Sequence, residues 1–275
     1  MPPKGSKKSA SANKTTTTTS STPQQNPKNK NNTPKPPNWP PLKPLVPASD
    51  LYLETLLDDQ IIIIRNLLTS TLCKTYVNFL SSLPLVTTPS RPKKGEAVRV
   101  NDRFQVHDPV FAERLWGETG LKGLVSDVGN EGGEAKGVGL WGGEVLGLNP
   151  NIRIYRYGAG QFFDKHYDDS VPLSPPNIPP FQPSQKTTRA RTTWTLLIYL
   201  TTCQGGETVF YSEPEPSASS KKKTAAAATP DPIVVGLETG MALLHRHGER
   251  CLLHEGREVV GGEKWVVRSD LVVGV

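Results

Sequence analysis

Two residues in the stretch FFDKHYDDS, residues 162–170, have the types and spacing of metal ligands: His166 and Asp168. On an extended strand, residues i and i+2 point to the same side, so this imidazole and this carboxylate can bind one ion. The same pattern also arises in polar turns, and it becomes specific only with a third ligand downstream. Two histidines and one carboxylate on one face of an octahedron leave three positions free, which is typical of non-haem Fe(II) oxygenases.

Three downstream histidines could supply the third ligand, namely His245, His247 and His254. A 2-oxo acid that chelates iron needs a fixed cation for its far carboxylate. Lys264 follows His254 by ten residues and begins a predicted strand, whereas Arg257 follows His247 by ten residues within a predicted turn. We therefore expect His254 to bind the metal and Lys264 to hold the carboxylate, with His247 as the alternative ligand. His245 and His247 are otherwise interpreted as a strand-end pair that makes ordinary hydrogen bonds.

Short β-rich segments must position these residues. From residue 151 onward they follow one another across turns, without a helix-length periodic segment between them: IRIYRY, TTWTLLIYLTT, ETVFYS, GMALLH, CLLHE and EKWVVRSDLVV. Such a series predicts an antiparallel sandwich or jelly roll.

The chain before residue 151 predicts a buried strand and two helices. The run QIIIIRNLL is β-branched and apolar, which favours a buried strand. One helix is predicted to follow it, with Ser70 as N-cap and Pro84 after its end, and a second is predicted to begin near Pro109. Residues 117–148 are rich in glycine and are predicted to be loop. The predicted fold class is therefore mainly β with flanking helices.

Composition divides the chain into a tail and a domain. Residues 1–46 are dominated by Lys, Ser, Thr, Pro, Asn and Gln, and such a segment cannot bury enough apolar area to fold. We predict that this tail is disordered and that the domain covers residues 47–275. Within the domain, residues 171–190 and 213–232 are predicted to be surface loop insertions, because the first is proline-rich and the second contains KKKTAAAATP.

The basic charge belongs to the tail. The first 49 residues hold eight lysines and no acid, whereas the remainder holds 24 basic and 26 acidic residues. This balance gives no support to nucleic-acid binding by the folded part, although the tail could bind a polyanion. Three cysteines, no apolar run long enough for a membrane span and no secretory leader predict a reducing compartment. We expect a cytoplasmic or nuclear protein that is not secreted and has no membrane partner.

Four segments together resemble one known family. The stretches RYGAGQFFDKHYD, TTWTLLIYLT, GGETVF and HEG, with a lysine ten residues after the last histidine, are similar to prolyl 4-hydroxylase-like 2-oxoglutarate/Fe(II) dioxygenases. The resemblance implies a double-stranded β-helix, which is a jelly roll of the cupin-like kind. It also implies a site whose residues are, for iron, His166, Asp168 and His254, for the C5 carboxylate of 2-oxoglutarate, Lys264 and Tyr199, and for the pocket wall, Tyr157 and Thr208.

The resemblance implies an enzyme that uses Fe(II), 2-oxoglutarate and O2 to hydroxylate its substrate, with ascorbate as reductant. A prolyl residue of a protein is the first substrate it suggests, and other protein side chains or a small molecule remain open. One alternative is a nucleic-acid demethylase of the same superfamily, which the near-neutral domain and Lys264 disfavour. Another is a non-catalytic cupin-like module that binds a metal or ligand without turnover.

Two further residues are interpreted as structural. Arg268 lies four residues after Lys264 and shares its face of the strand. We interpret it as a strand-end arginine whose charge is satisfied locally, with a second cation in the pocket as the alternative. His107 lies beside the second predicted helix and is interpreted as a structural or surface residue.

Overall fold

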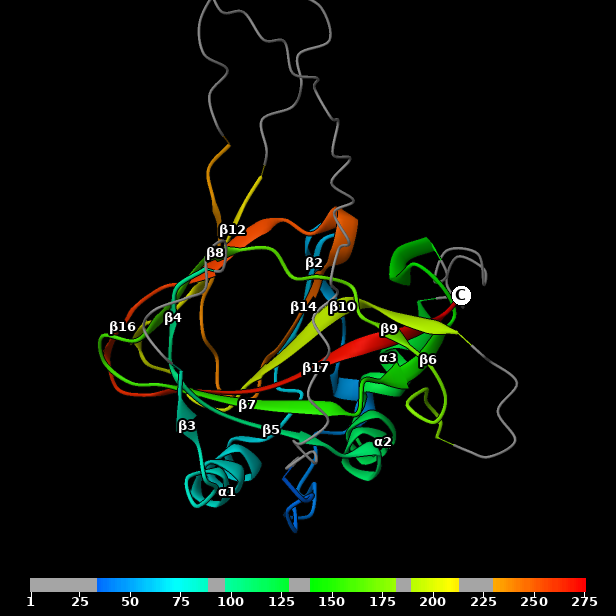
Figure 1. Cartoon of the computed structure of the whole chain (residues 1–275), viewed down its shortest axis with the longest axis horizontal. Coiled ribbons are helices and arrows are strands. Elements are labelled where there is room, and N and C mark those ends of the chain that lie inside the picture. The colour runs from blue at the N-terminus through cyan, green and yellow to red at the C-terminus, as the bar shows by residue number, and fades with distance from the viewer. Residues whose placement is uncertain (1–33, 89–96, 129–138, 182–188, 213–229) are drawn as a thin grey trace, which may run out of the picture. The chain divides into compact units, whose positions relative to one another are not determined.

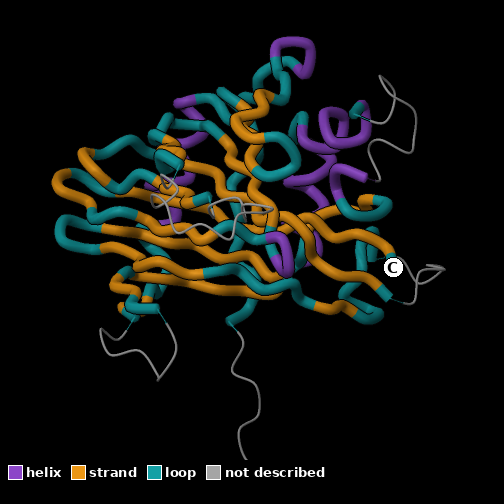
Figure 2. Tube along the Cα trace, turned by 90° about the horizontal axis from the view of Figure 1, so that it is seen from above, coloured by secondary structure: helices purple, strands orange, loops and turns teal. Residues whose placement is uncertain are grey.

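The computed structural model describes residues 34–88, 97–128, 139–181, 189–212 and 230–275. The chain divides into two units, and the first of them, Met1–Asn32, lies outside the described residues. The second unit carries every element of Figures 1 and 2. No helix within the described ranges has the length and apolar character needed to cross a membrane.

The larger sheet forms one wall of the domain, and all of its strands pair antiparallel. Its strand order is β1-β2-β14-β10-β17-β7-β5-β3, with β6 paired to β17 and β9 paired to β10. Its strands are β1 (Glu54–Leu57), β2 (Ile61–Ile64), β3 (Val86–Thr87), β5 (Asp102–His107), β6 (Val145–Leu148), β7 (Asn151–Tyr157), β9 (Pro172–Leu173), β10 (Ala190–Tyr199), β14 (Ala242–Arg246) and β17 (Lys264–Gly274).

The smaller sheet faces the larger one, and its strands carry His166 and His254. Its strand order is β13-β12-β15-β8-β4. A separate two-stranded sheet consists of β11 (Gln204–Gly205) and β16 (Val259–Gly261). Its strands are β4 (Arg99–Val100), β8 (Phe162–His166), β12 (Thr208–Tyr211), β13 (Ile233–Val235) and β15 (Leu253–Gly256). Two facing antiparallel sheets form a jelly-roll core, so the predicted fold class is confirmed.

Both faces of the larger sheet are buried at its centre, which explains why β2, β14 and β17 are buried at successive positions without alternation. In β2, Ile62 and Ile64 belong to the cluster beneath the helices, whereas Ile61 and Ile63 belong to the cluster between the two sheets. All four side chains are at most 2% exposed. Successive residues of a strand point to opposite faces, so a strand covered on both sides needs an apolar residue at each position.

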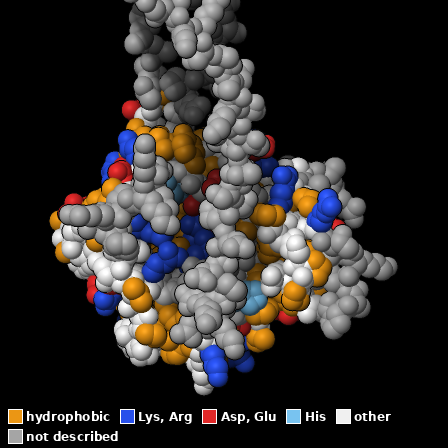
Figure 3. Space-filling model, in the orientation of Figure 1, with side chains coloured by type: hydrophobic (Ala, Val, Ile, Leu, Met, Phe, Trp, Pro, Cys, Tyr) orange, Lys and Arg blue, Asp and Glu red, His pale blue; other side chains and the backbone are white. Residues whose placement is uncertain are grey.

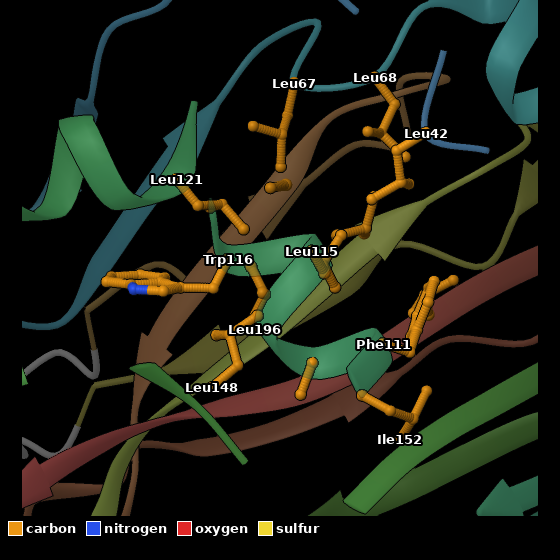
Figure 4. Packing of buried hydrophobic residues seen from close by; sticks show 14 of the residues in the cluster. Leu42, Leu67, Leu68, Phe111, Leu115, Trp116, Leu121, Leu148, Ile152 and Leu196 are labelled. Carbon is orange, nitrogen blue, oxygen red and sulfur yellow. The ribbon is translucent and has the colours of Figure 1, made fainter. Parts of the chain in front are cut away.

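Helices cover the outer face of the larger sheet. They are α1 (Ser70–Leu80), α2 (Pro109–Glu118) and α3 (Leu121–Asp127). Figure 1 shows α1 and α2 on the side of β5 and β7 that faces away from β8 and β12. Figure 4 shows Phe111 and Leu115 of α2 directed toward Ile152 and Leu196 of the sheet. The Thr69 hydroxyl caps α1 by accepting a bond from the Leu72 amide at 3.2 Å.

Several sequence-based predictions need correction. The N-cap of α1 is Thr69 instead of Ser70, because the hydroxyl that accepts from the first turn of the helix lies one residue earlier than predicted. The predicted loop at 117–148 contains α3 and β6, whose apolar residues Leu121, Val125 and Leu148 are buried. The predicted insertion at 171–190 contains β9 and the buried Ile178, and residues 182–188 lie outside the described part. Most of the predicted insertion at 213–232 is also outside it.

The folded part also begins earlier than the predicted boundary at residue 47. The Trp39 ring stacks on Phe111, with centroids 4.0 Å apart, and its Nε1 donates to Asp108 Oδ2 at 2.7 Å. Leu42 is 1% exposed, and the Tyr76 hydroxyl donates to the Pro40 carbonyl at 2.9 Å. Because this segment is rich in proline, the sequence did not predict that Trp39 and Leu42 pack into the hydrophobic core.

Candidate metal centre and cosubstrate pocket

Neighbouring strands of the smaller sheet bring two histidines together. His166 ends β8, His254 lies in β15, and the two residues are directly paired in the antiparallel register. Their rings lie 4.2 Å apart between centroids. Asp168 follows β8 by two residues, and the ligand atoms of His166, Asp168 and His254 all lie within 4.8 Å of one another. The three side chains predicted from the sequence as metal ligands therefore converge at one point.

Hydrogen bonds fix which nitrogen of each imidazole faces that point. The Nδ1 of His166 lies 2.8 Å from the Asp164 carbonyl oxygen, and the Nδ1 of His254 lies 2.9 Å from the Leu252 carbonyl oxygen. A carbonyl oxygen only accepts, so each Nδ1 carries the proton and each Nε2 has a free lone pair. These Nε2 atoms lie 3.9 Å and 3.8 Å from the carboxylate oxygens of Asp168. Metal-binding histidines are oriented by the same kind of bond.

The carboxylate of Asp168 is held by Arg268 and Thr195. Arg268 Nη2 lies 2.9 Å from Oδ2, Nη1 donates to Oδ1 at 3.2 Å, and the Thr195 hydroxyl donates to Oδ2 at 2.9 Å. Oδ2 thus accepts two bonds, and Oδ1 keeps a lone pair for an ion. Burial alone would raise the pKa of Asp168, but Arg268 and the nearby histidines hold it well below its usual value.

The two imidazoles are neutral at physiological pH, as metal ligands must be. Burial lowers the pKa of His166 to about 3, with His254 adding to the effect. Burial also lowers the pKa of His254. Two neutral imidazoles and one ionised carboxylate are a donor set that suits Fe(II), so the described residues fit the ion that the motif implies.

The other end of the pocket holds a buried cation. Lys264 is 5% exposed, and its Nζ donates to the Gly206 carbonyl at 2.7 Å. Gly206 has a φ of 73°, a conformation that favours glycine, and its carbonyl is thereby directed at the amine. Burial lowers the pKa of Lys264 to about 8. An ammonium group has three donors, so two remain for an anionic ligand.

Three predicted pocket residues surround this lysine. Lys264 pairs in register with Tyr157, and its Nζ lies 5.5 Å and 5.4 Å from the ring centroids of Tyr157 and Tyr199. The Tyr199 hydroxyl shares a 2.8 Å hydrogen bond with Thr208 Oγ1. Thr208, Tyr157 and Lys264 line the pocket, whereas Tyr199 lies behind Thr208. The partner that the buried Tyr199 hydroxyl requires is thus a threonine.

A single pocket joins the two ends. It spans about 440 Å³, part of which is open to solvent, and its lining includes His166, Asp168, His254 and Lys264. Figure 3 shows Lys and Arg side chains gathered in the hollow of this face, with acidic and histidine side chains beside them. Three convergent candidate metal ligands and a buried cation in one pocket form an arrangement that a chelating 2-oxo acid could use.

The sequence profile of the 2OG-Fe(II) oxygenase superfamily matches residues 152–269. This range contains all seven predicted site residues. The match supports a 2-oxoglutarate- and Fe(II)-dependent oxygenase within these residues. No curated protein matches the oxygenase.

Solved structures similar to this oxygenase come from several sources. A prolyl-4-hydroxylase from Pseudomonas putida is 12% identical, with a TM-score of 0.48, 78% of this chain covered and 94% of that one. The viral collagen prolyl hydroxylase of Paramecium Bursaria Chlorella virus-1, in complex with 2OG, is 15% identical, with a TM-score of 0.42 and coverages of 78% and 96%. HygX from Streptomyces hygroscopicus, with nickel, 2-oxoglutarate and hygromycin B, is 14% identical, with a TM-score of 0.45 and coverages of 78% and 83%.

Sequence reasoning misjudged one residue of the oxygenase pocket, Arg268, and was partly right about two histidines. The interpretation of a hydrogen-bonded histidine pair holds for His247, whose two nitrogens each lie 2.9 Å from a threonine hydroxyl. His245 also makes such a bond, with its Nδ1 3.4 Å from the Arg246 carbonyl oxygen, but it lines the pocket as well, and its Nε2 lies 3.7 Å from Asp168 Oδ2. The interpretation of Arg268 as a strand-end arginine is wrong, because it lies in the middle of β17, lines the pocket and binds Asp168. The shared strand face of Lys264 and Arg268 was the signal that could have found the latter.

A second cluster of metal-binding residue types in the oxygenase has the wrong orientation. The ligand atoms of His245, Cys251 and His254 lie within 4.8 Å of one another. However, Cys251 Sγ approaches Nδ1 of His254, at 3.9 Å, and that nitrogen is engaged by the Leu252 carbonyl. Cys251 therefore faces a different nitrogen of His254 from the one that faces Asp168.

Proposed function

We propose that this oxygenase hydroxylates a side chain of a protein, with a prolyl residue as the first candidate, in a reaction coupled to the decarboxylation of 2-oxoglutarate. His166, Asp168 and His254 would hold Fe(II), and Lys264 would bind the C5 carboxylate. The ion and 2-oxoglutarate together supply the activation of O2. Ascorbate is the reductant expected to sustain turnover.

The single observation that carries this proposal is the charge arrangement along the pocket. Three ligand atoms converge at one end, and at the other end a buried ammonium group has no carboxylate within salt-bridge distance among the residues that the structure describes. A buried cation without a counter-charge is costly, and a dicarboxylate would compensate it. Lys264 begins β17, which is paired on both sides within the larger sheet, so the position of its amine is fixed. The amine would therefore orient the bound acid.

Apolar side chains between the two ends supply the walls that keep water from the reacting groups. Phe163, Leu197 and Val266 line the pocket, and the Phe163 ring stacks on His166 with centroids 3.5 Å apart. Outside the pocket, Tyr167 and Val171 flank Asp168 and are 53% and 45% exposed.

The test is succinate release from 2-oxoglutarate with Fe(II) and ascorbate. We expect turnover by the wild type, and a loss of about a hundredfold or more in His166→Ala, because an open ligand position removes the metal geometry. His107→Ala is the matched control, since His107 is an exposed histidine outside the pocket. Equal turnover by the His166 and His107 variants would contradict the assigned ligand. Retained metal without turnover in the wild type would instead favour a binding module.

The substrate is tested separately with proline-containing peptides. We expect a mass increase of one oxygen atom and hydroxyproline after hydrolysis. Oxidation of oligonucleotides instead would support the nucleic-acid demethylase. The arrangement of Arg268 disfavours that alternative, because both of its terminal nitrogens are engaged by Asp168 and neither is free for a phosphate. We infer a reducing compartment, cytoplasm or nucleus, from Cys73, Cys203 and Cys251, which are all free thiols.

A further inference from the structure

Two arginines, Arg99 and Arg103, converge on one ring of the pocket wall. This arginine pair comes from opposite sheets, because Arg99 lies in β4 of the smaller sheet and Arg103 in β5 of the larger one. Their guanidinium carbons lie 5.6 Å and 5.9 Å from the centroid of the Tyr155 ring, which lines the pocket. Figure 3 shows Lys and Arg side chains gathered in the hollow of this face. The pocket wall at Tyr155 is therefore flanked by two positive charges.

The backbone fixes both arginines at this wall. Arg99 pairs in register with Phe163 of β8, and Arg103 pairs in register with Tyr155 of β7. Asn101, the single residue between β4 and β5, is fully buried. One buried residue thus carries the chain from the smaller sheet to the larger one and leaves an arginine on each side of the crossing.

The charges of the arginine pair lack a counter-charge. Neither Arg99 nor Arg103 has a carboxylate within salt-bridge distance among the residues that the structure describes, whereas Arg156 pairs with Asp102 at 2.7 Å. Arg103 Nη2 donates to the side-chain oxygen of Gln105 at 2.6 Å, which is a neutral acceptor. Burial lowers the pKa of Arg103, with Arg99 adding to the effect. Partly buried cations without compensation are costly, and an anionic ligand removes that cost.

The positive field also acts on the Tyr155 hydroxyl. Burial alone would raise the pKa of Tyr155, but four nearby arginines hold it below its usual value. In order of effect, they are Arg268, Arg153, Arg99 and Arg103. Carboxylates pair with the first two of these arginines. The uncompensated part of the field therefore belongs to the arginine pair.

The arginine pair lies close to the candidate metal centre, with one aromatic ring between them. The guanidinium carbon of Arg99 lies 4.8 Å from the centroid of the Phe163 ring, and that ring stacks on His166 with centroids 3.5 Å apart. An extended peptide rises about 3.3 Å per residue. A substrate group bound at Arg99 would thus lie about two residues away from a side chain that reacts at the metal centre.

We propose that the arginine pair binds a carboxylate of the substrate, so that the oxygenase selects peptides with an aspartate or glutamate within about two residues of the hydroxylated side chain. This inference rests on the proposed function and adds a determinant of specificity to it. The planar guanidinium group suits a carboxylate because it can donate two parallel hydrogen bonds. Nucleic acid is less suited, because the chain from Asp50 onward holds 24 basic and 26 acidic residues and therefore lacks the basic excess of a phosphate-binding domain.

The test measures peptide binding to the full-length protein loaded with Co(II) and 2-oxoglutarate. Two fluorescent peptides have a central proline, and the two residues on each side of it are aspartate in one peptide and asparagine in the other. We expect the Kd of the aspartate peptide to be lower by about tenfold or more, because charge-assisted hydrogen bonds are the stronger kind. Equal Kd values, or binding of neither peptide, would overturn the proposal.

Substitutions then assign the preference to the arginine pair. Arg99→Gln and Arg103→Gln should each reduce it to about threefold or less, and Arg99→Lys should keep most of it. Arg191→Gln, at an exposed position of β10, is the control and should match the wild type. Because β4 is an edge strand, the two Arg99 variants decide the outcome if Arg103→Gln does not fold. A preference that persists in the glutamine variants would overturn the proposal and assign binding to other cations, such as the lysines of the tail.

Two further measurements separate this inference from the proposed function. If the wild type binds 2-oxoglutarate with Co(II) but does not distinguish the peptides, the role of the arginine pair alone is overturned. Absence of 2-oxoglutarate binding by the wild type would overturn the proposed function as well. Tighter binding of a single-stranded oligonucleotide than of the aspartate peptide, weakened in the same glutamine variants, would overturn the peptide assignment in favour of nucleic acid.

Discussion

The Asp168 carboxylate is a shared acceptor in this pocket, and its two oxygens have different roles. Oδ2 accepts from Thr195 and Arg268, and Oδ1 is bonded only by Arg268 at 3.2 Å among the described residues. Arg268 also lies 3.5 Å from Asp270, so its position is set from two sides. Burial would lower the pKa of this guanidinium, but Asp168 and the other acidic neighbours raise it instead. The arginine is therefore a permanent cation that keeps Asp168 ionised.

Arg268→Gln should destabilise the protein more without metal than with it. Removing one partner of a buried ion pair costs about 3–5 kcal/mol, because the remaining charge is left without compensation. A bound divalent cation would restore part of that compensation at Asp168. Urea unfolding with and without Co(II) measures the difference, and Arg250→Gln, on an exposed 3-10 turn, is the control. A loss of stability that Co(II) does not reduce would contradict this role.

At the scale of elements, β17 sets the spacing between the two ends of the pocket. Lys264 and Arg268 lie on the same face, four residues apart, which corresponds to about 13 Å along an extended strand. The strand pairs with β7 and β10 over most of its length, so neither cation can shift independently. Lys264 and the arginine that holds Asp168 therefore move as one body.

The lysine on β17 predicts a pH dependence of cosubstrate binding. Because burial lowers the pKa of Lys264 to about 8, the amine loses its charge as the pH rises through that value. We expect the Kd for 2-oxoglutarate, measured by calorimetry with Co(II), to rise up to tenfold per pH unit above it. In Lys264→Arg, the guanidinium stays charged, so the Kd should stay constant to pH of about 9. Parallel curves for both proteins would contradict the anchor.

The sequence predicted the type of most elements and that His166, Asp168 and His254 converge. It did not predict which side chains are buried in the pocket or which strands pair with each other. Period-two alternation indicates which residues share a face, but it does not tell which sheet a strand joins. The strand containing His245 enters the larger sheet between β2 and β10, and this placement directs the ring at Asp168. No local pattern around His245 contains that information. The α3 helix was missed because glycine-rich neighbours masked its short apolar repeat.

At the scale of the whole molecule, an irregular segment before the first strand contacts both α1 and α2. Residues 34–46 contain no helix and only an isolated bridge between Leu45 and Leu68. Trp39 nevertheless stacks on α2 and contacts Phe79 of α1, with centroids 5.7 Å apart. The helices on the outer face of the sheet are thus held by chain that precedes them in sequence.

Trp39→Ala should lower stability without changing the chemistry. Loss of a buried tryptophan costs about 3–5 kcal/mol. Trp39→Phe keeps the stacking and loses the bond to Asp108, so its cost should be about 1–2 kcal/mol. Denaturant unfolding measures both values, and succinate release at a temperature where each variant is folded should match the wild type. Equal stability of the alanine variant would show that this segment is dispensable.

The position of β17 determines when the larger sheet can be completed during synthesis. It follows every other described strand along the chain, yet it lies between β10 and β7 in the sheet. On the ribosome, both neighbours are synthesised before the strand that must separate them. The nascent chain therefore lacks a closed barrel and both cations until this strand is inserted. Loading with iron and 2-oxoglutarate must be a late event, after translation has passed these residues.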